Sequence, residues 1–108
     1  MDDHLQKILD KQKELDDRIM KERNNGNHVS IQDKCRALLH EVVELENETS
    51  WKWWKKKEEN KEAMKEELID ILHFWASIAN QLGIDSKQIH EIYMKKNQVN
   101  HERQNNGY

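Results

Sequence analysis

The scarcity of helix breakers constrains this chain more than any other feature. Proline is absent, and glycine occurs only at positions 26, 83 and 107. Glycine and proline are the residues that most often end helices, so long uninterrupted helices are the default expectation. Apolar residues also recur at the helical period along most of the chain. We therefore predict an all-α protein, a bundle of about four helices in one domain spanning residues 1–108.

The first two helices are bounded by a clear loop. Helical periodicity runs from about His4 to Glu22, and the polar, glycine-containing segment 24–27 that follows is typical of a turn. Ser30 is a good N-cap for the second helix, with Asp33 in its first turn. This helix is expected to weaken at residues 47–50, where a charged connector begins.

The last two helices have equally plain limits. The third is expected from about Lys61 to Leu82, with Gly83 as its C-cap. We expect Ser86 to cap the fourth. The apolar stripe of the third helix should face inward, with Trp75 in the core; its members are Met64, Leu68, Ile71, Leu72, Trp75, Ile78 and Leu82.

Composition excludes several classes of protein. The net charge of -3 argues against a general nucleic-acid binder. With no apolar run near 18 residues and no signal-peptide pattern, we expect a cytoplasmic protein without membrane association. The only cysteine, Cys35, excludes a disulfide framework. Hydrophobic residues are 35% against 36% charged, so a lone chain has little apolar material for a core. We expect a homodimer or homotetramer whose subunits share one.

Two acidic pairs point to a metal site. Glu41 and Glu44 are spaced i, i+3 in the second helix, and Glu67 and Asp70 repeat this spacing in the third. The spacing puts both carboxylates of a pair on one helix face. The alternative is a solvated acidic face, because the chain has 21 acidic residues. Apolar neighbours on both helices favour the metal site, in which four carboxylates would surround a hard divalent cation.

A basic stripe follows on the fourth helix. Lys96, Asn100 and Arg103 fall at i, i+4 and i+7 and so share a face. Lysine as a point charge and arginine as a fork suit a polyphosphate. A solvated basic face is the alternative.

The connector carries a cluster of aromatic residues. Trp51, Trp53 and Trp54 lie within four positions and are followed by lysines. Such rings can stack on a nucleobase, or they can pack at a subunit interface. His73 lies three residues after Asp70, where it either approaches the metal face or is held by a hydrogen bond within the helical core.

Together these segments resemble the all-α, dimeric type of dUTPase, a branch of the MazG-like nucleotide pyrophosphohydrolases. The resemblance covers most of the chain. Residues 41–45 and 67–74 are similar to the two acidic motifs of the family, and residues 50–55 are similar to its aromatic-lysine segment. Residues 93–108 resemble the phosphate-binding helix of the family and the segment that follows it, and residues 12–16 resemble its N-terminal glutamine segment. Family members usually have asparagine at the position of Asp16. They also continue beyond Gly107-Tyr108, so we expect either a C-terminal truncation or phosphate contacts from elsewhere.

The resemblance implies Mg²⁺-dependent hydrolysis of dUTP to dUMP and pyrophosphate, a step that sanitises the nucleotide pool. It extends to dUDP as a further substrate and to Mn²⁺ in place of Mg²⁺. The implied sites are metal ligands Glu41, Glu44, Glu67 and Asp70, a general base at Glu41 or Glu44, phosphate contacts Lys96, Asn100 and Arg103, and base contacts Gln12, Asp16, Trp51 and Trp54. One alternative is a MazG-like enzyme for dCTP or a non-canonical nucleotide. The other is a non-catalytic dimeric helical interaction module.

Overall fold

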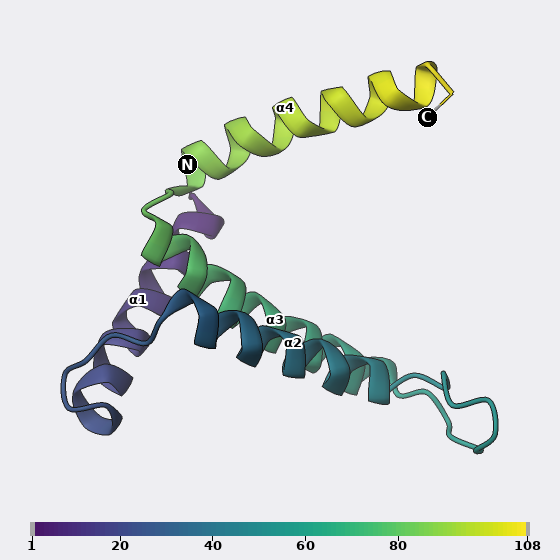
Figure 1. Cartoon of the computed structure of the whole chain (residues 1–108), viewed down its shortest axis with the longest axis horizontal. Coiled ribbons are helices and arrows are strands. Elements are labelled where there is room, and N and C mark those ends of the chain that lie inside the picture. The colour runs from purple at the N-terminus through teal and green to yellow at the C-terminus, as the bar shows by residue number, and fades with distance from the viewer. Residues whose placement is uncertain (1, 108) are drawn as a thin grey trace.

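Four helices make up the fold, in a computed structural model that describes residues 2–107. They are α1 (His4–Arg23), α2 (Ile31–Asn47), α3 (Lys61–Leu82) and α4 (Ser86–Asn105). α3 is central, because it packs against both α1 and α2 (Figure 1). α2 and α3 lie side by side, and the connector of residues 48–60 forms the tip where they join. The prediction of an all-α fold is confirmed.

The helix ends follow the capping signals, with one correction. The Asp33 backbone N–H donates to Ser30 Oγ at 3.1 Å, as expected of an N-cap. Gly83 ends α3 in the left-handed conformation, with φ of 76°. At α4, however, the N-cap is Asp85 and not Ser86. Asp85 forms a capping box with Gln88, in which each side chain accepts a hydrogen bond from the other residue's backbone N–H.

A small core joins α1 to α3. Leu9 is fully buried against Ala76 and Ala79, whose small side chains let the two helices approach closely. Asn80 Nδ2 also donates to the carbonyl oxygen of Leu9 at 2.8 Å. This contact fixes α1 along α3, so that residues one turn further along α1 face α3 as well.

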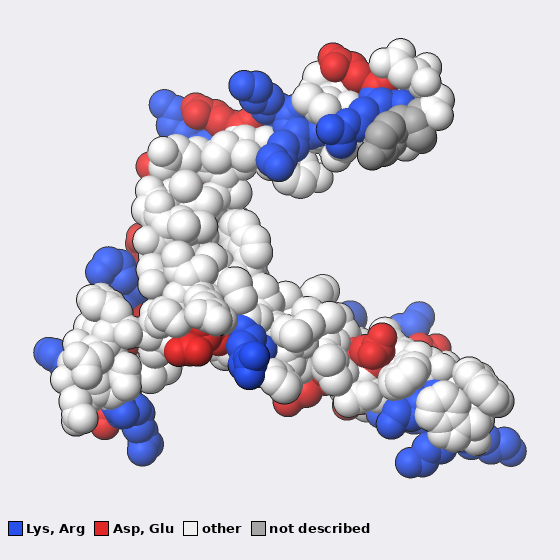
Figure 2. Space-filling model, in the orientation of Figure 1, with Lys and Arg blue, Asp and Glu red and all other residues white. Residues whose placement is uncertain are grey.

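α4 is attached to the remainder of the fold at its first turn. The Ser86 backbone N–H donates to Gln6 Oε1 at 3.0 Å, and the Ser86 hydroxyl donates to Asp3. This hydrogen bond, followed by the bond from the Gln6 backbone, lowers the pKa of Asp3. Near its start, α4 also packs Ile89 against the core of Leu9, Ala76 and Ala79. Within the described chain the rest of α4 projects away from α2 and α3 (Figures 1 and 2).

Much apolar surface is left uncovered in one chain. Trp75, expected in the core, is 39% exposed, and its stripe neighbours Leu68 and Leu82 are more exposed still. The radius of gyration is 17.3 Å, whereas a compact domain of this length has about 13 Å. The period of the stripe predicted the apolar face of α3 correctly, but the chain itself does not cover all of that face.

None of the helices in residues 2–107 has both the length and the apolar character that crossing a bilayer requires.

Candidate metal centre and base pocket

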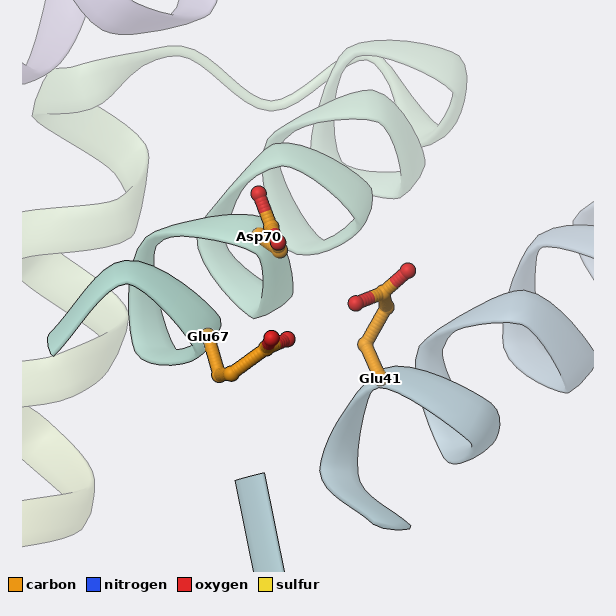
Figure 3. Close-up of side chains that lie close together, drawn as sticks. All are labelled: Glu41, Glu67 and Asp70. Atoms are coloured by element: carbon orange, nitrogen blue, oxygen red, sulfur yellow. The ribbon is translucent and has the colours of Figure 1, made fainter. Parts of the chain in front are cut away.

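Three carboxylates meet between α2 and α3. Glu41 projects from α2 toward Glu67 and Asp70 on α3 (Figure 3). One oxygen from each of the three residues lies within 4.8 Å of the others. The i, i+3 spacing on α3 puts Glu67 and Asp70 on the face that packs against α2, so this packing assembles the group.

The group is electrostatically unfavourable by itself. Burial is the main reason that the pKa of Glu41 is raised; interactions with Glu44 come next, followed by the charges of Asp70 and Glu67. Burial is also the first cause of the raised pKa of Glu67, with the Glu44 charge second. Glu44 therefore belongs to the same electrostatic cluster, although it stands outside the three-residue group. The structure thus groups three of the four predicted metal ligands, and the charge of the fourth, Glu44, acts on two of them.

Two atoms of this cluster have no partner. Glu41 Oε2 and Glu67 Oε2 are buried, and among the described residues neither accepts a hydrogen bond. Buried carboxylate oxygens without a donor are costly unless a cation or proton balances them. Because the donor set consists of carboxylates alone, it fits a hard divalent cation such as Mg²⁺, Mn²⁺ or Ca²⁺.

A second polar group lies between α1 and α3. Gln12 Nε2 donates to Asp16 Oδ1 at 2.9 Å, and Ser77 Oγ donates to Asp16 Oδ2 at 2.6 Å. Gln12 Oε1 is 3.0 Å from His73 Nδ1. Gln12 and His73 line a cavity of about 480 Å³ with mostly apolar walls. His73 thus has the hydrogen bond that one of the two alternatives expected, but its side chain is exposed and not buried in the helical core. His73 is also not one of the residues that form the carboxylate group.

The tryptophans lie apart from this cavity. Trp54 makes edge-on contacts with Trp51 and Trp53, with ring centroids 5.8 and 5.4 Å away. All three rings are exposed, on the connector at the tip of α2 and α3. One chain therefore holds the four predicted base contacts as two separate pairs, Gln12 with Asp16 and Trp51 with Trp54.

The predicted phosphate contacts are also separate from the carboxylates in one chain. Lys96, Asn100 and Arg103 all lie on α4. Within residues 2–107, the part of α4 that carries these three residues packs on neither α2 nor α3. Figure 2 shows basic side chains along α4 and open space between α4 and the α2–α3 pair.

Comparison with known proteins decides the family. A family described as dUTPase matches residues 4–89 and, in an overlapping second match, residues 76–108. The chain belongs to the dUTPase family. Its resemblance to the all-α branch, seen first in the acidic motifs, is confirmed by this match and by the helical fold.

A curated relative of this dUTPase-family chain is the dCTP pyrophosphatase of Enterobacteria phage T4. The two are 35% identical over 96 residues, an alignment that covers 72% of this chain and 56% of the relative. The chain thus spans little more than half the length of that relative. No solved structure matches the chain significantly.

One residue of the polar group between α1 and α3 was not anticipated. Ser77 is 3% exposed and bonded to Asp16, yet a single serine inside a helix belongs to no recognisable motif. The available signal was positional: Ser77 follows His73 by four residues and so lies on the same face of α3.

Proposed function

We propose that this protein is a metal-dependent nucleoside triphosphate pyrophosphohydrolase that converts dUTP to dUMP and pyrophosphate. The observation that carries the proposal is the carboxylate group of Glu41, Glu67 and Asp70, with two buried oxygens that no described residue satisfies. Membership of the dUTPase family supports the substrate class.

Glu41, Glu44, Glu67 and Asp70 would hold Mg²⁺, or Mn²⁺ in its place. Bound there, the cation would lower the pKa of a water molecule and screen phosphate charge. A carboxylate of the first pair accepts the proton of the attacking water as the new phosphorus–oxygen bond forms and the phosphoanhydride bond breaks. Glu41 and Glu44 are both candidates for this base, because both belong to the acidic pair on α2.

The substrate's base would enter the cavity lined by Gln12 and His73. Asp16 would hold Gln12 in place through the hydrogen bond that it accepts from the Gln12 amide. Trp51 and Trp54 are exposed and available for stacking if the connector or a second subunit approaches the cavity. The T4 relative favours dCTP as a second candidate substrate, since it is named for that activity.

We further propose that the active form is a homodimer or homotetramer. The exposed apolar faces of α2 and α3 support this, as does the distance of α4 from both helices. In one chain Lys96, Asn100 and Arg103 do not approach the carboxylates, so phosphate contacts from α4 require a second copy or a different α4 position.

The decisive test is pyrophosphate release from dUTP, dCTP, dTTP and UTP, with and without Mg²⁺. We expect release from a deoxypyrimidine triphosphate, dependent on the metal, and a loss of about 100-fold or more in Glu44→Gln. Glu46→Gln is the matched control, because Glu46 is an exposed carboxylate on the same helix outside the cluster. It should retain activity.

Each alternative predicts a distinct result. A non-catalytic interaction module would release pyrophosphate from no nucleotide, and neither Mg²⁺ nor a dUTP analogue would raise its melting temperature. Full activity in Glu44→Gln would reject the assignment of Glu44 while leaving the reaction itself intact.

A further inference from the structure

A continuous hydrogen-bonded chain connects α3 to α1 and returns to α3 behind the cavity. It runs from the Ser77 hydroxyl to Asp16, from Asp16 to the Gln12 amide, and from Gln12 to His73 Nδ1, with distances of 2.6, 2.9 and 3.0 Å. Gln12 is 9% exposed and Ser77 only 3%. Its buried members make the chain a rigid element, so the positions of its donors and acceptors are determined by their neighbours.

The carboxylate of Asp16 determines the direction of every bond in this chain. An ionised carboxylate can only accept hydrogen bonds. Gln12 must therefore turn Nε2, its donor, toward Asp16, which leaves Oε1 facing His73. An amide oxygen is also only an acceptor, so His73 must carry its proton on Nδ1. In the neutral imidazole the other ring nitrogen, Nε2, is then an acceptor.

The cavity thereby acquires a defined pattern of hydrogen-bond donors and acceptors. His73 Nε2 has no partner among the described residues, and His73 lines the cavity, so this acceptor is available to a ligand. The second Nε2 hydrogen of Gln12 is likewise unused within the described chain. Among the other lining residues, Ile8, Leu15 and Leu72 are apolar and suit the faces of a flat ring. Lys7 and Lys11 also line the cavity, and their ammonium groups are the same in the parent and in the variants considered below.

Replacing Asp16 by asparagine would allow the donors and acceptors of this hydrogen-bonded chain to be reversed. An asparagine amide nitrogen can donate to Gln12 Oε1, which turns Gln12 Nε2 toward His73. His73 Nδ1 must then accept, so the proton moves to Nε2 and the acceptor in the cavity becomes a donor. Uracil and cytosine differ by the same inversion: uracil has a donor at N3 and an acceptor at position 4, and cytosine has the opposite.

We propose that Asp16 selects the pyrimidine base by setting, through Gln12, which ring nitrogen of His73 carries the proton. Asp16 is a positioning residue, whereas Gln12 and His73 contact the base. The proposal rests on the proposed hydrolysis of a deoxypyrimidine triphosphate, with either dUTP or dCTP as the substrate, and it distinguishes 4-oxo from 4-amino pyrimidine nucleotides at that site. It also assigns Ser77 a supporting role, because its hydroxyl holds the carboxylate without affecting the polarity of Gln12.

The kinetic test compares kcat/KM for dUTP and dCTP in the full chain and two variants. Asp16→Asn, which preserves shape, should shift the ratio of the two values by at least about tenfold, away from the base that the parent protein prefers. Ser77→Ala is the matched control; it leaves Asp16 as an acceptor, so the ratio should stay within about twofold even if both values fall. An unchanged ratio in Asp16→Asn, or an equal shift in both variants, would overturn the proposal.

Two readouts do not depend on catalysis. Nitrogen-15 NMR at pH 8, above the range in which imidazoles usually titrate, should show His73 protonated on Nδ1 in the parent and on Nε2 in Asp16→Asn. His73→Gln assigns the signal. Calorimetry with dUMP and dCMP should show the same change of preference in binding. If no nucleotide were hydrolysed, the proposed reaction would be wrong, yet these measurements would still show whether Asp16 determines which nitrogen of His73 carries the proton. A parent His73 protonated on Nε2 would refute it.

Discussion

Replacing Glu41 by glutamine should stabilise the metal-free protein. Glutamine keeps the shape and removes one charge from a group whose ligand oxygens lie within 4.8 Å of one another. At that separation two unit charges repel by about 1 kcal/mol in water and by about 3.5 kcal/mol at an effective dielectric constant of 20. Because Glu44 and Asp70 are exposed, the value for water applies, and we expect a gain of about 1 kcal/mol.

Divalent metal should reverse the order of stability. A cation at 100 times its dissociation constant adds about 2.7 kcal/mol to the parent protein, and Glu41→Gln should lose most of this increment. The assay is thermal unfolding in EDTA and then in excess Mg²⁺. For a domain of this size 1 kcal/mol corresponds to a shift of about 4–8 °C in Tm. The variant should therefore melt above the parent in EDTA and below it in Mg²⁺.

The same variant has a defined pH dependence. The pKa of Glu41 is raised in the folded protein, so its carboxylate destabilises the fold when ionised, near neutral pH and above. As the pH falls through this raised pKa toward the ordinary carboxyl range, the folded protein takes up the proton and the penalty disappears. The advantage of Glu41→Gln in EDTA should shrink accordingly.

Two results would refute this reasoning about the cluster. One is a Glu41→Gln variant less stable than the parent in EDTA at pH 8, since that would mean the carboxylate is favourably bound without metal. The other is an equal gain in Glu46→Gln, because the effect would then reflect the net charge of the chain and not the cluster.

Three further substitutions test the fold by urea or sedimentation measurements. Leu9→Ala should lower the free energy of unfolding by about 2–5 kcal/mol, because Leu9 is fully buried between α1 and α3; a loss under 1 kcal/mol would contradict that packing. Gly83→Ala should cost about 1–2 kcal/mol from backbone strain alone, since φ is 76° and an added Cβ meets nothing within 4 Å. Leu39→Glu should reduce the sedimenting mass if α2 lies at a subunit interface, because Leu39 is 62% exposed in one chain; a monomeric parent protein would refute the proposed assembly.

The limits of the helices could be predicted closely from local signals. The bounds of α3, Lys61–Leu82, agree with the prediction, because a glycine follows the last periodic residue. The cap of α4 was displaced by one residue, from Ser86 to Asp85. Both are good capping residues, and the deciding signal was Gln88, which stands three positions after Asp85 and completes the capping box.

Contacts between residues far apart in the sequence were harder to predict. The spacing of Glu67 and Asp70 shows that they share a face of α3, but only the packing of α2 on α3 brings Glu41 to them. Periodicity likewise identifies Trp75 as part of an apolar stripe without showing what covers it. The position of α4 could not be predicted, because its attachment depends on Asp3 and Gln6, about eighty residues earlier in the chain.

The attachment of α4 has a consequence for how the protein responds to dilution. A helix of 20 residues that packs on its own chain near one end gains little from tertiary contacts, and tertiary packing is the main source of helix stability in proteins. Its backbone amides should therefore exchange with solvent quickly, and proteases should cut there first, whenever no neighbour covers it. Protein concentration would then determine how long α4 survives intact, which makes the lifetime of this helix a direct measure of assembly.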